Sequence, residues 1–245
     1  GGIAKGVVAV SNGVNKIFQG DSIALGANAI FNAHILLNSG DSNEHTGHNL
    51  SEQVGYYAYA HLDGLDNVGG STIITANGFM LYDHDKRSEA AGCLIESHND
   101  LFVRAEPDKW RKIAKFKFVF EDIPQHHNSV VLGDNDHLPI TKYNGHSDYV
   151  KKGYDYMKTK ISSLLSKLPV EDLFIDENAQ ASESHILGTT RMSVDAKNGV
   201  IDKHLLHHNY RNVFVLGGST FPTISPANPT LTLSALSLWA ADTNF

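Results

Sequence analysis

The stretch that decides the fold is residues 211–242, RNVFVLGGSTFPTISPANPTLTLSALSLWAAD. Its first part, residues 212–216, is a short apolar run typical of a buried strand, and it leads directly into Gly217 and Gly218. Two successive glycines predict a tight turn where the backbone can approach a ligand closely. A proline-rich loop follows, and a helix is expected over residues 231–242.

The start of that helix carries chemical information. Asn228 is a possible N-cap, and Pro229 suits the first turn because it needs no N–H donor. A helix N-terminus presents free backbone N–H groups and the positive end of the helix dipole. The sequence therefore predicts such an end beside a polar loop and a glycine turn.

Segments further upstream extend the pattern. Residues 185–192, 199–202 and 212–242, in this order, resemble the C-terminal signature of the glucose-methanol-choline (GMC) family of flavin-dependent oxidoreductases. Taken alone, His185 would more often cap a loop, and Asn228 would be ordinary turn chemistry. The occurrence of several motifs in register favours the family.

The resemblance implies FAD as the cofactor and assigns roles to residues. His185 matches the family's catalytic base, and Asn228 matches the second residue that contacts the same substrate hydroxyl. Gly217 and Gly218 would lie along the cofactor's linker. A helix beginning at Pro229 and Thr230 would direct its dipole at the flavin.

The N-terminal region shows related features. Residues 6–25 read as a hairpin whose second strand becomes fully apolar, and Gly26 ends it before a helix expected over 29–37. This arrangement resembles the strand, glycine turn and helix beside the adenosine part of FAD. Asn49, in the segment 47–50, matches an element that approaches the flavin, so we expect it to be buried although it begins a glycosylation sequon.

The middle of the chain has the texture of an antiparallel sheet. Phe116, Phe118 and Phe120 share one face of a strand at period two, which predicts that this face packs on a core. An amphipathic helix is expected over 147–168 and ends before Pro169. The strands expected in this region are residues 71–75, 78–82, 93–95, 115–121, 129–132 and 140–143.

Composition bounds the function. The 245 residues contain 41% hydrophobic side chains, enough for one large domain or two lobes. A net charge of -7, with no basic cluster longer than Lys151 and Lys152, disfavours binding to nucleic acid or an anionic membrane. No apolar run approaches the ~20 residues of a membrane span. Cys93 is the single cysteine, which favours a reducing compartment such as the cytoplasm and predicts a buried thiol.

A dinucleotide-binding enzyme also needs a Gly-x-Gly-x-x-Gly turn after its first strand, and the sequence contains none. The resemblance therefore covers only the C-terminal half of the family's pattern. We expect the chain to be a fragment, or one piece of a split enzyme whose partner carries the N-terminal FAD-binding segment.

The predicted fold class is a mixed α/β (α+β) chain. It combines a partial, Rossmann-like FAD-binding lobe from residues 1–46 and 179–245 with an antiparallel-sheet substrate lobe, residues 47–178, that carries packed helices. The implied reaction is oxidation of an alcohol, on a sugar or polyol, by hydride transfer to FAD. No motif identifies the electron acceptor. The alternative is a non-catalytic subunit or a carbohydrate-binding module that retains the fold.

Other chemistries find little support. The fourteen histidines include His45, His48 and the pair His207 and His208, but no carboxylate or cysteine completes a zinc pattern. They are expected to be surface residues, and no metal site is predicted. A Gly-x-Ser-x-Gly nucleophile elbow is absent, which disfavours a serine hydrolase.

Overall fold

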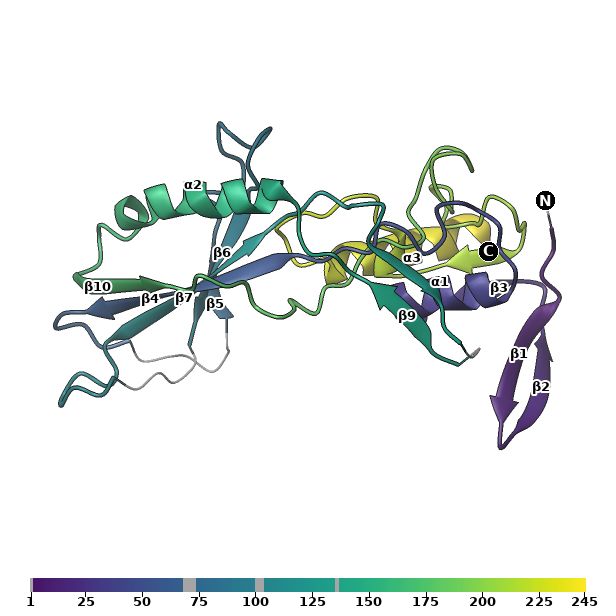
Figure 1. Cartoon of the computed structure of the whole chain (residues 1–245), viewed down its shortest axis with the longest axis horizontal. Coiled ribbons are helices and arrows are strands. Elements are labelled where there is room, and N and C mark those ends of the chain that lie inside the picture. The colour runs from purple at the N-terminus through teal and green to yellow at the C-terminus, as the bar shows by residue number, and fades with distance from the viewer. Residues whose placement is uncertain (1, 68–73, 100–103, 135–136) are drawn as a thin grey trace.

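The computed structural model describes residues 2–67, 74–99, 104–134 and 137–245. Its helices and strands form two groups at the two ends of an elongated molecule (Figure 1). One group is a five-stranded sheet covered by a helix. The other contains a short parallel strand pair with two helices, and a hairpin projects beyond it.

The five-stranded sheet is antiparallel throughout and has the order β10-β4-β7-β6-β5. Its strands are β4 (Val54–Leu62), β5 (Ile74–Gly78), β6 (Cys93–His98), β7 (Ile113–Phe120) and β10 (Val170–Ile175). Helix α2 (Asp148–Leu164) lies along one face of this sheet (Figure 1).

The phenylalanine stripe of β7 faces α2, as the sequence predicts. Phe118 and Phe120 are fully buried, and Phe116 is half-buried against the same core. The apolar side of α2, which includes Met157 and Ile161, packs on this core. Because side chains alternate along a strand, the residues between the phenylalanines stand on the opposite face.

The second group is built around a parallel pair. Strand β3 (Ile23–Leu25) pairs with β11 (Val213–Val215), although the two are far apart in the sequence. Helix α1 (Asn28–Asn38) follows β3, and the 3-10 turn η1 (Gly218–Thr220) and helix α3 (Thr230–Asn244) follow β11. This pairing sets the first turn after β3 beside the glycine turn after β11.

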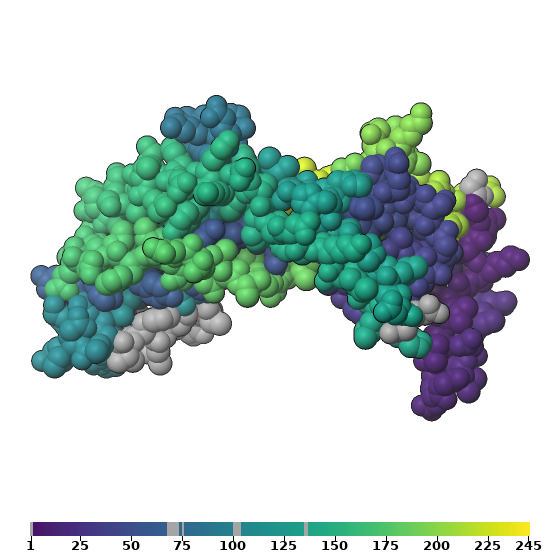
Figure 2. All heavy atoms as spheres, viewed as in Figure 1, coloured from purple at the N-terminus to yellow at the C-terminus, as the bar shows by residue number. Residues whose placement is uncertain are grey.

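Two further hairpins complete the molecule. Strands β8 (Ser129–Leu132) and β9 (Pro139–Lys142) pack on α1, where buried Val130 meets Ala33 and Leu50. Strands β1 (Gly6–Ser11) and β2 (Val14–Gln19) form a hairpin at the end of the molecule (Figure 2). Every residue of β2 is exposed.

The mixed helix and sheet architecture is confirmed, and two local predictions are wrong. The apolar segment 78–82 is not a strand, because β5 ends at Gly78 and the exposed Phe79 and Met80 begin a turn. The hairpin's second strand does not continue to Leu25, because β2 ends at Gln19 and β3 joins β11 instead. Strands β4 and β10 were not predicted. Of the strand expected at 71–75, residues 71–73 lie outside the described residues.

Within the described ranges, no helix combines the length and the apolar character that a bilayer crossing requires.

Candidate active site

A cleft of about 410 Å³ lies where the two glycine turns meet the start of α3. Its walls come from the β3–α1 junction, from residues 184–187, from residues 216–218 and from the first half of α3. Six of the eight sequence-predicted site residues line it: Gly26, His185, Gly217, Gly218, Pro229 and Thr230. Asn49 and Asn228 are not among its lining residues.

The glycine turn is tight, as expected. Gly217 has a positive φ of 87°, a backbone conformation that disfavours a side chain, and the space around it is open. Gly218 is enclosed instead, because a Cβ there would lie 2.8 Å from a side-chain carbon of Leu187. The turn therefore exposes backbone to the cleft at Gly217 and packs closely against Leu187 at Gly218.

His185 is half-buried in the wall of the cleft. Its Nδ1 lies 2.7 Å from Oε1 of Gln53, a buried residue just before β4. Among the described residues, Nε2 has no hydrogen-bond partner. Burial lowers the pKa of His185 from its usual value near 6.5, so the imidazole is neutral at physiological pH.

Asn228 does not cap α3. The N-cap position is Pro229, which makes no side-chain capping bond, and the Asn228 amide instead donates to Oε1 of Glu96 at 3.4 Å. The side chain thus turns toward the five-stranded sheet. Asn228 is solvent-exposed in this chain, whereas Glu96 is buried.

Ionisable side chains stand on the sheet face opposite α2. Glu96 and His98 of β6 pair in register with Lys117 and Lys115 of β7. Lys117 Nζ lies 2.5 Å from Oε2 of Glu183, which precedes His185 by two positions. Sequence reasoning did not identify these residues. Their only signal is their alternation with the phenylalanines, which equally suits a solvated face.

Close packing holds this charged face together. A Cβ on Gly55 of β4 would lie 1.9 Å from a carboxylate oxygen of Glu183, so the strand needs a glycine at this point. Burial raises the pKa of Glu183, while the neighbouring Lys117 opposes that shift. Buried charges of this kind persist when they are paired, and they often mark functional surfaces.

Asn49 is buried, as the sequence predicts, and sits in a left-handed conformation with φ of 63°. Its backbone is clamped by Gly188, where a Cβ would lie 2.0 Å from the Asn49 carbonyl oxygen. Its side-chain nitrogen Nδ2 is buried and lacks a hydrogen-bond partner within the described part of the chain. An orphaned buried donor is costly, which indicates a ligand or solvent partner.

The expectation of surface histidines is wrong for at least three of them, because His45, His98 and His207 are buried. His207 is buried with its Nε2 3.3 Å from a carboxylate oxygen of Asp41, and His45 is buried with Nε2 2.7 Å from the carbonyl of Lys197. Buried imidazoles require such partners. Across the described ranges, no group of three or more potential ligands is arranged around a metal position.

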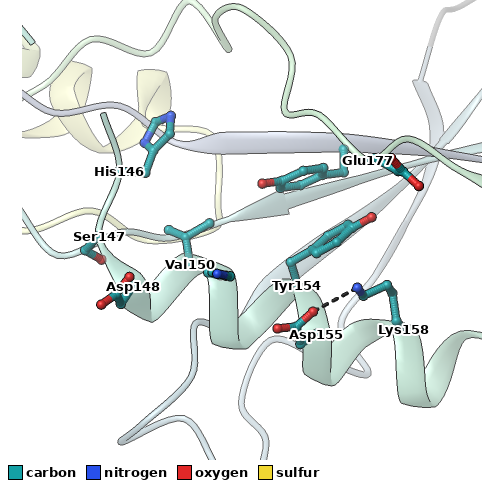
Figure 3. A pocket seen from close by; sticks show the side chains of 10 residues that line it. His146, Ser147, Asp148, Val150, Tyr154, Asp155, Lys158 and Glu177 are labelled. Atoms are coloured by element: carbon teal, nitrogen blue, oxygen red, sulfur yellow. Dashed lines mark ion pairs between the residues drawn. The ribbon is translucent and has the colours of Figure 1, made fainter. Parts of the chain in front are cut away.

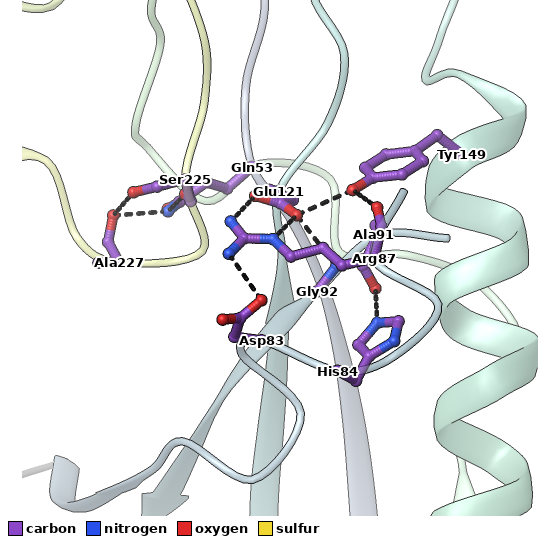
Figure 4. Close-up of polar contacts among 10 residues, drawn as sticks. All are labelled: Gln53, Asp83, His84, Arg87, Ala91, Gly92, Glu121, Tyr149, Ser225 and Ala227. Carbon is purple, nitrogen blue, oxygen red and sulfur yellow. Dashed lines mark hydrogen bonds and ion pairs between the residues drawn. The ribbon is translucent and has the colours of Figure 1, made fainter. Parts of the chain in front are cut away.

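Two other polar regions have structural explanations. A hollow of about 500 Å³ between β4 and α2 contains Tyr56 stacked on Tyr154, whose ring is already covered by Lys158 (Figure 3). Near the N-terminal end of α2, where Tyr149 also contacts Glu121, Arg87 binds the buried carboxylate of Glu121 through two hydrogen bonds of 2.8 and 2.6 Å (Figure 4). Neither adjoins His185.

Comparisons with known proteins point to one family. Residues 148–237 match the family model described as GMC oxidoreductase. A segment of 59 residues is 44% identical to the fructose dehydrogenase large subunit of Gluconobacter japonicus, and it covers 24% of this chain and 11% of that protein.

Solved structures share the whole fold. The formate oxidase of Aspergillus oryzae RIB40, in a variant studied for FAD modification, superimposes with a TM-score of 0.74 at 16% identity. The match covers 98% of this chain and 57% of that one. Pyridoxine 4-oxidase of Mesorbium loti gives a TM-score of 0.67 at 18% identity and covers 99% and 55%. The chain thus spans little more than half the length of these structures.

Proposed function

Because the chain carries the C-terminal region of a GMC oxidoreductase, we propose that it supplies the catalytic residues of an FAD-dependent enzyme that oxidises an alcohol to a carbonyl. The observation that carries this proposal is the position of His185. A neutral, half-buried imidazole with one fixed and one open ring nitrogen lines the same cleft as the Gly217–Gly218 turn and the start of α3.

Several features of the chain suit a flavin dinucleotide. The orphaned Nδ2 of Asn49 offers a donor, and Gly217 offers open backbone. The uncapped start of α3, which follows Pro229, offers backbone N–H groups from Thr230 onward to an electron-rich ring edge. Gly26 would border the dinucleotide at the β3–α1 junction. When bound, FAD supplies an acceptor for the hydride of the substrate's C–H bond.

In this proposal the chain's own residues handle the hydroxyl. The open Nε2 of His185 accepts the hydroxyl proton, a role that suits a neutral imidazole near physiological pH. Asn228 hydrogen-bonds the same oxygen and fixes its direction without competing for the proton. Glu96 holds one N–H of Asn228 and leaves the other for the substrate.

We further propose a sugar-like or polyol substrate. Support comes from the sheet face beside the site, where the buried Glu96 and His98 and the partly buried pair of Lys117 and Glu183 carry donors and acceptors for several hydroxyl groups. The name of the fructose dehydrogenase relative states that it acts on a sugar, which agrees with a polar substrate site. A partner segment or chain is proposed to carry the pyrophosphate-binding turn.

The alternative is a non-catalytic subunit or a carbohydrate-binding module derived from such an enzyme. A purely binding role does not need a neutral base held beside a cofactor cleft, and a structural role does not need the open nitrogen of His185. The alternative predicts binding of sugars without any electron transfer.

The deciding experiment mixes the flavin-loaded full-length protein anaerobically with candidate donors. The panel contains fructose, glucose and sorbitol, with formate and pyridoxine as donors taken from the names of the structural relatives. We expect a sugar or polyol to bleach the flavin absorbance. If none of the alcohols bleached the flavin, the oxidation proposal would be rejected and the binding alternative would remain.

A further inference from the structure

Gln53 occupies an unusual position between the loop and the base. It is buried, and its amide nitrogen donates to the carbonyl oxygens of Ser225 at 2.6 Å and Ala227 at 2.9 Å (Figure 4). These two carbonyls belong to the loop that carries Asn228. Both N–H hydrogens of the amide are therefore used.

The orientation of this amide is fixed by its neighbours. Flipping it would set its carbonyl oxygen against two other carbonyl oxygens at hydrogen-bonding distance, which is repulsive. Oε1 must consequently face His185, where it can only accept a hydrogen bond. It follows that Nδ1 of His185 carries the proton and that Nε2 holds the lone pair when the ring is neutral.

We propose that Gln53 is a positioning residue that sets the tautomer of His185 and ties this side chain to the loop carrying Asn228. Through one amide, the protein selects the nitrogen that accepts a proton and holds the second substrate contact in place. The inference rests on the proposed function, and it deepens that function by naming what makes His185 a base at Nε2.

The charges around His185 define what a change at Gln53 would do. Glu52, just before Gln53, and Glu96 of β6 favour the protonated imidazole, whereas Lys117 of β7 opposes it. Burial of the ring outweighs the two carboxylates in the native protein. A third carboxylate in direct contact with Nδ1 would reverse that balance, because it would stabilise the imidazolium.

The first test reads the tautomer directly and needs no turnover. Nitrogen-15 NMR of histidine-labelled, flavin-loaded protein, with the His185→Gln variant identifying the signal, should show a protonated Nδ1 and a bare Nε2 above the pKa of His185. A signal for protonated Nε2 would overturn the proposal. Because this measurement needs no substrate, it tests the role of Gln53 even if the protein oxidises no alcohol.

The second test compares the pH dependence of flavin reduction in Gln53→Glu and Gln53→Leu. In Gln53→Glu the acid limb should move upward by about one pH unit or more, because the new charge favours imidazolium. In Gln53→Leu the rate should fall about 10-fold or more with no upward shift, because the tautomer is no longer fixed. Gln125→Leu is the matched control, since Gln125 also donates to a loop carbonyl, that of Gly145, at 3.3 Å.

The outcomes distinguish a role of Gln53 in positioning His185 from a role in packing the loop. Equal losses in both Gln53 variants at every pH would show that Gln53 only supports the loop, and would overturn the proposal. If Gln53→Glu does not fold, the Gln53→Leu spectrum decides: a switch of the proton to Nε2 supports the proposal, and a retained Nδ1 proton contradicts it.

Discussion

At the scale of single residues, the proposal assigns the role of base to His185 and that of an orienting amide to Asn228. His185 lines the cleft, whereas Asn228, in the loop before α3, lies outside the lining and donates to Glu96. Replacing His185 by Ala should slow flavin reduction by about 10²–10⁴-fold, the usual contribution of a positioned general base. Anaerobic rapid mixing isolates this step from reoxidation. Full-speed reduction in the variant would exclude His185 as the base.

Asn228→Ala should be less harmful, because it removes one orienting hydrogen bond and leaves the base in place. A loss of about 10–10³-fold is expected for a donor directed at developing charge. If both residues act on one substrate oxygen, as proposed, the two losses in the double variant should combine to less than their product. Strictly multiplicative losses would show that the two residues act independently.

The rate of flavin reduction should also depend on pH in a defined direction. Burial lowers the pKa of His185 below its usual 6.5, and only the neutral ring accepts a proton. The rate should therefore be constant at neutral pH and fall as the pH drops through a midpoint below 6.5. Stopped-flow traces from pH 5 to 8 test this expectation, and a midpoint above 7 would contradict the burial argument.

The sequence predicts the site residues that belong to local motifs, but it does not predict which side chains contact them. His185 and the glycines of the 217–218 turn stand in recognisable segments, so the cleft residues could be named in advance. Gln53, in the segment before β4, and Glu96 and Lys117, in β6 and β7, lie far from His185 in the sequence. Only the sheet register brings them beside His185, and no local pattern encodes that register.

At the scale of elements, β7 presents its phenylalanines to α2 and its lysines to the opposite face of the sheet. Phe118→Ala should lower the free energy of unfolding by about 3–5 kcal/mol, through lost burial and the cavity that remains. Chemical denaturation of the flavin-loaded protein measures this change. Phe174→Ala on β10 is the matched control, because that ring is 52% exposed while Phe118 is 1% exposed. Similar losses in both variants would contradict the packing argument.

The sheet shows which elements sequence patterns miss. Strand β4 lies inside the sheet, between β10 and β7, but its sequence VGYYAYAHL contains glycine and alanines, which favour strands only weakly. Those small residues are required by the fold, since Gly55 admits Glu183 and the fully buried Ala58 and Ala60 face the core. The segment 78–82 shows the opposite error: its apolar residues predict a strand, but Phe79 and Met80 are exposed at a turn and only Leu81 is buried in the core.

At the scale of the whole molecule, two apolar surfaces are uncovered. On α3, Leu231 is 82% and Leu238 is 72% exposed, and the β1–β2 hairpin exposes Val8, Ile17 and Phe18. Both surfaces belong to the group built around the parallel pair β3–β11, a two-stranded sheet too small to be a complete dinucleotide-binding fold. Apolar patches of this kind mark interaction sites.

These surfaces and the missing pyrophosphate turn lead to one expectation. Residues 1–245 produced alone should not retain flavin in stoichiometric amount, because the cleft contacts would hold only one side of the cofactor and no Gly-x-Gly-x-x-Gly loop would bind its pyrophosphate. The protein completed by an N-terminal FAD-binding segment should stay yellow after desalting, and α3 should gain protection from hydrogen exchange. A bound-flavin spectrum from the isolated chain would show instead that α3, Asn49 and the two glycine turns suffice to hold the cofactor.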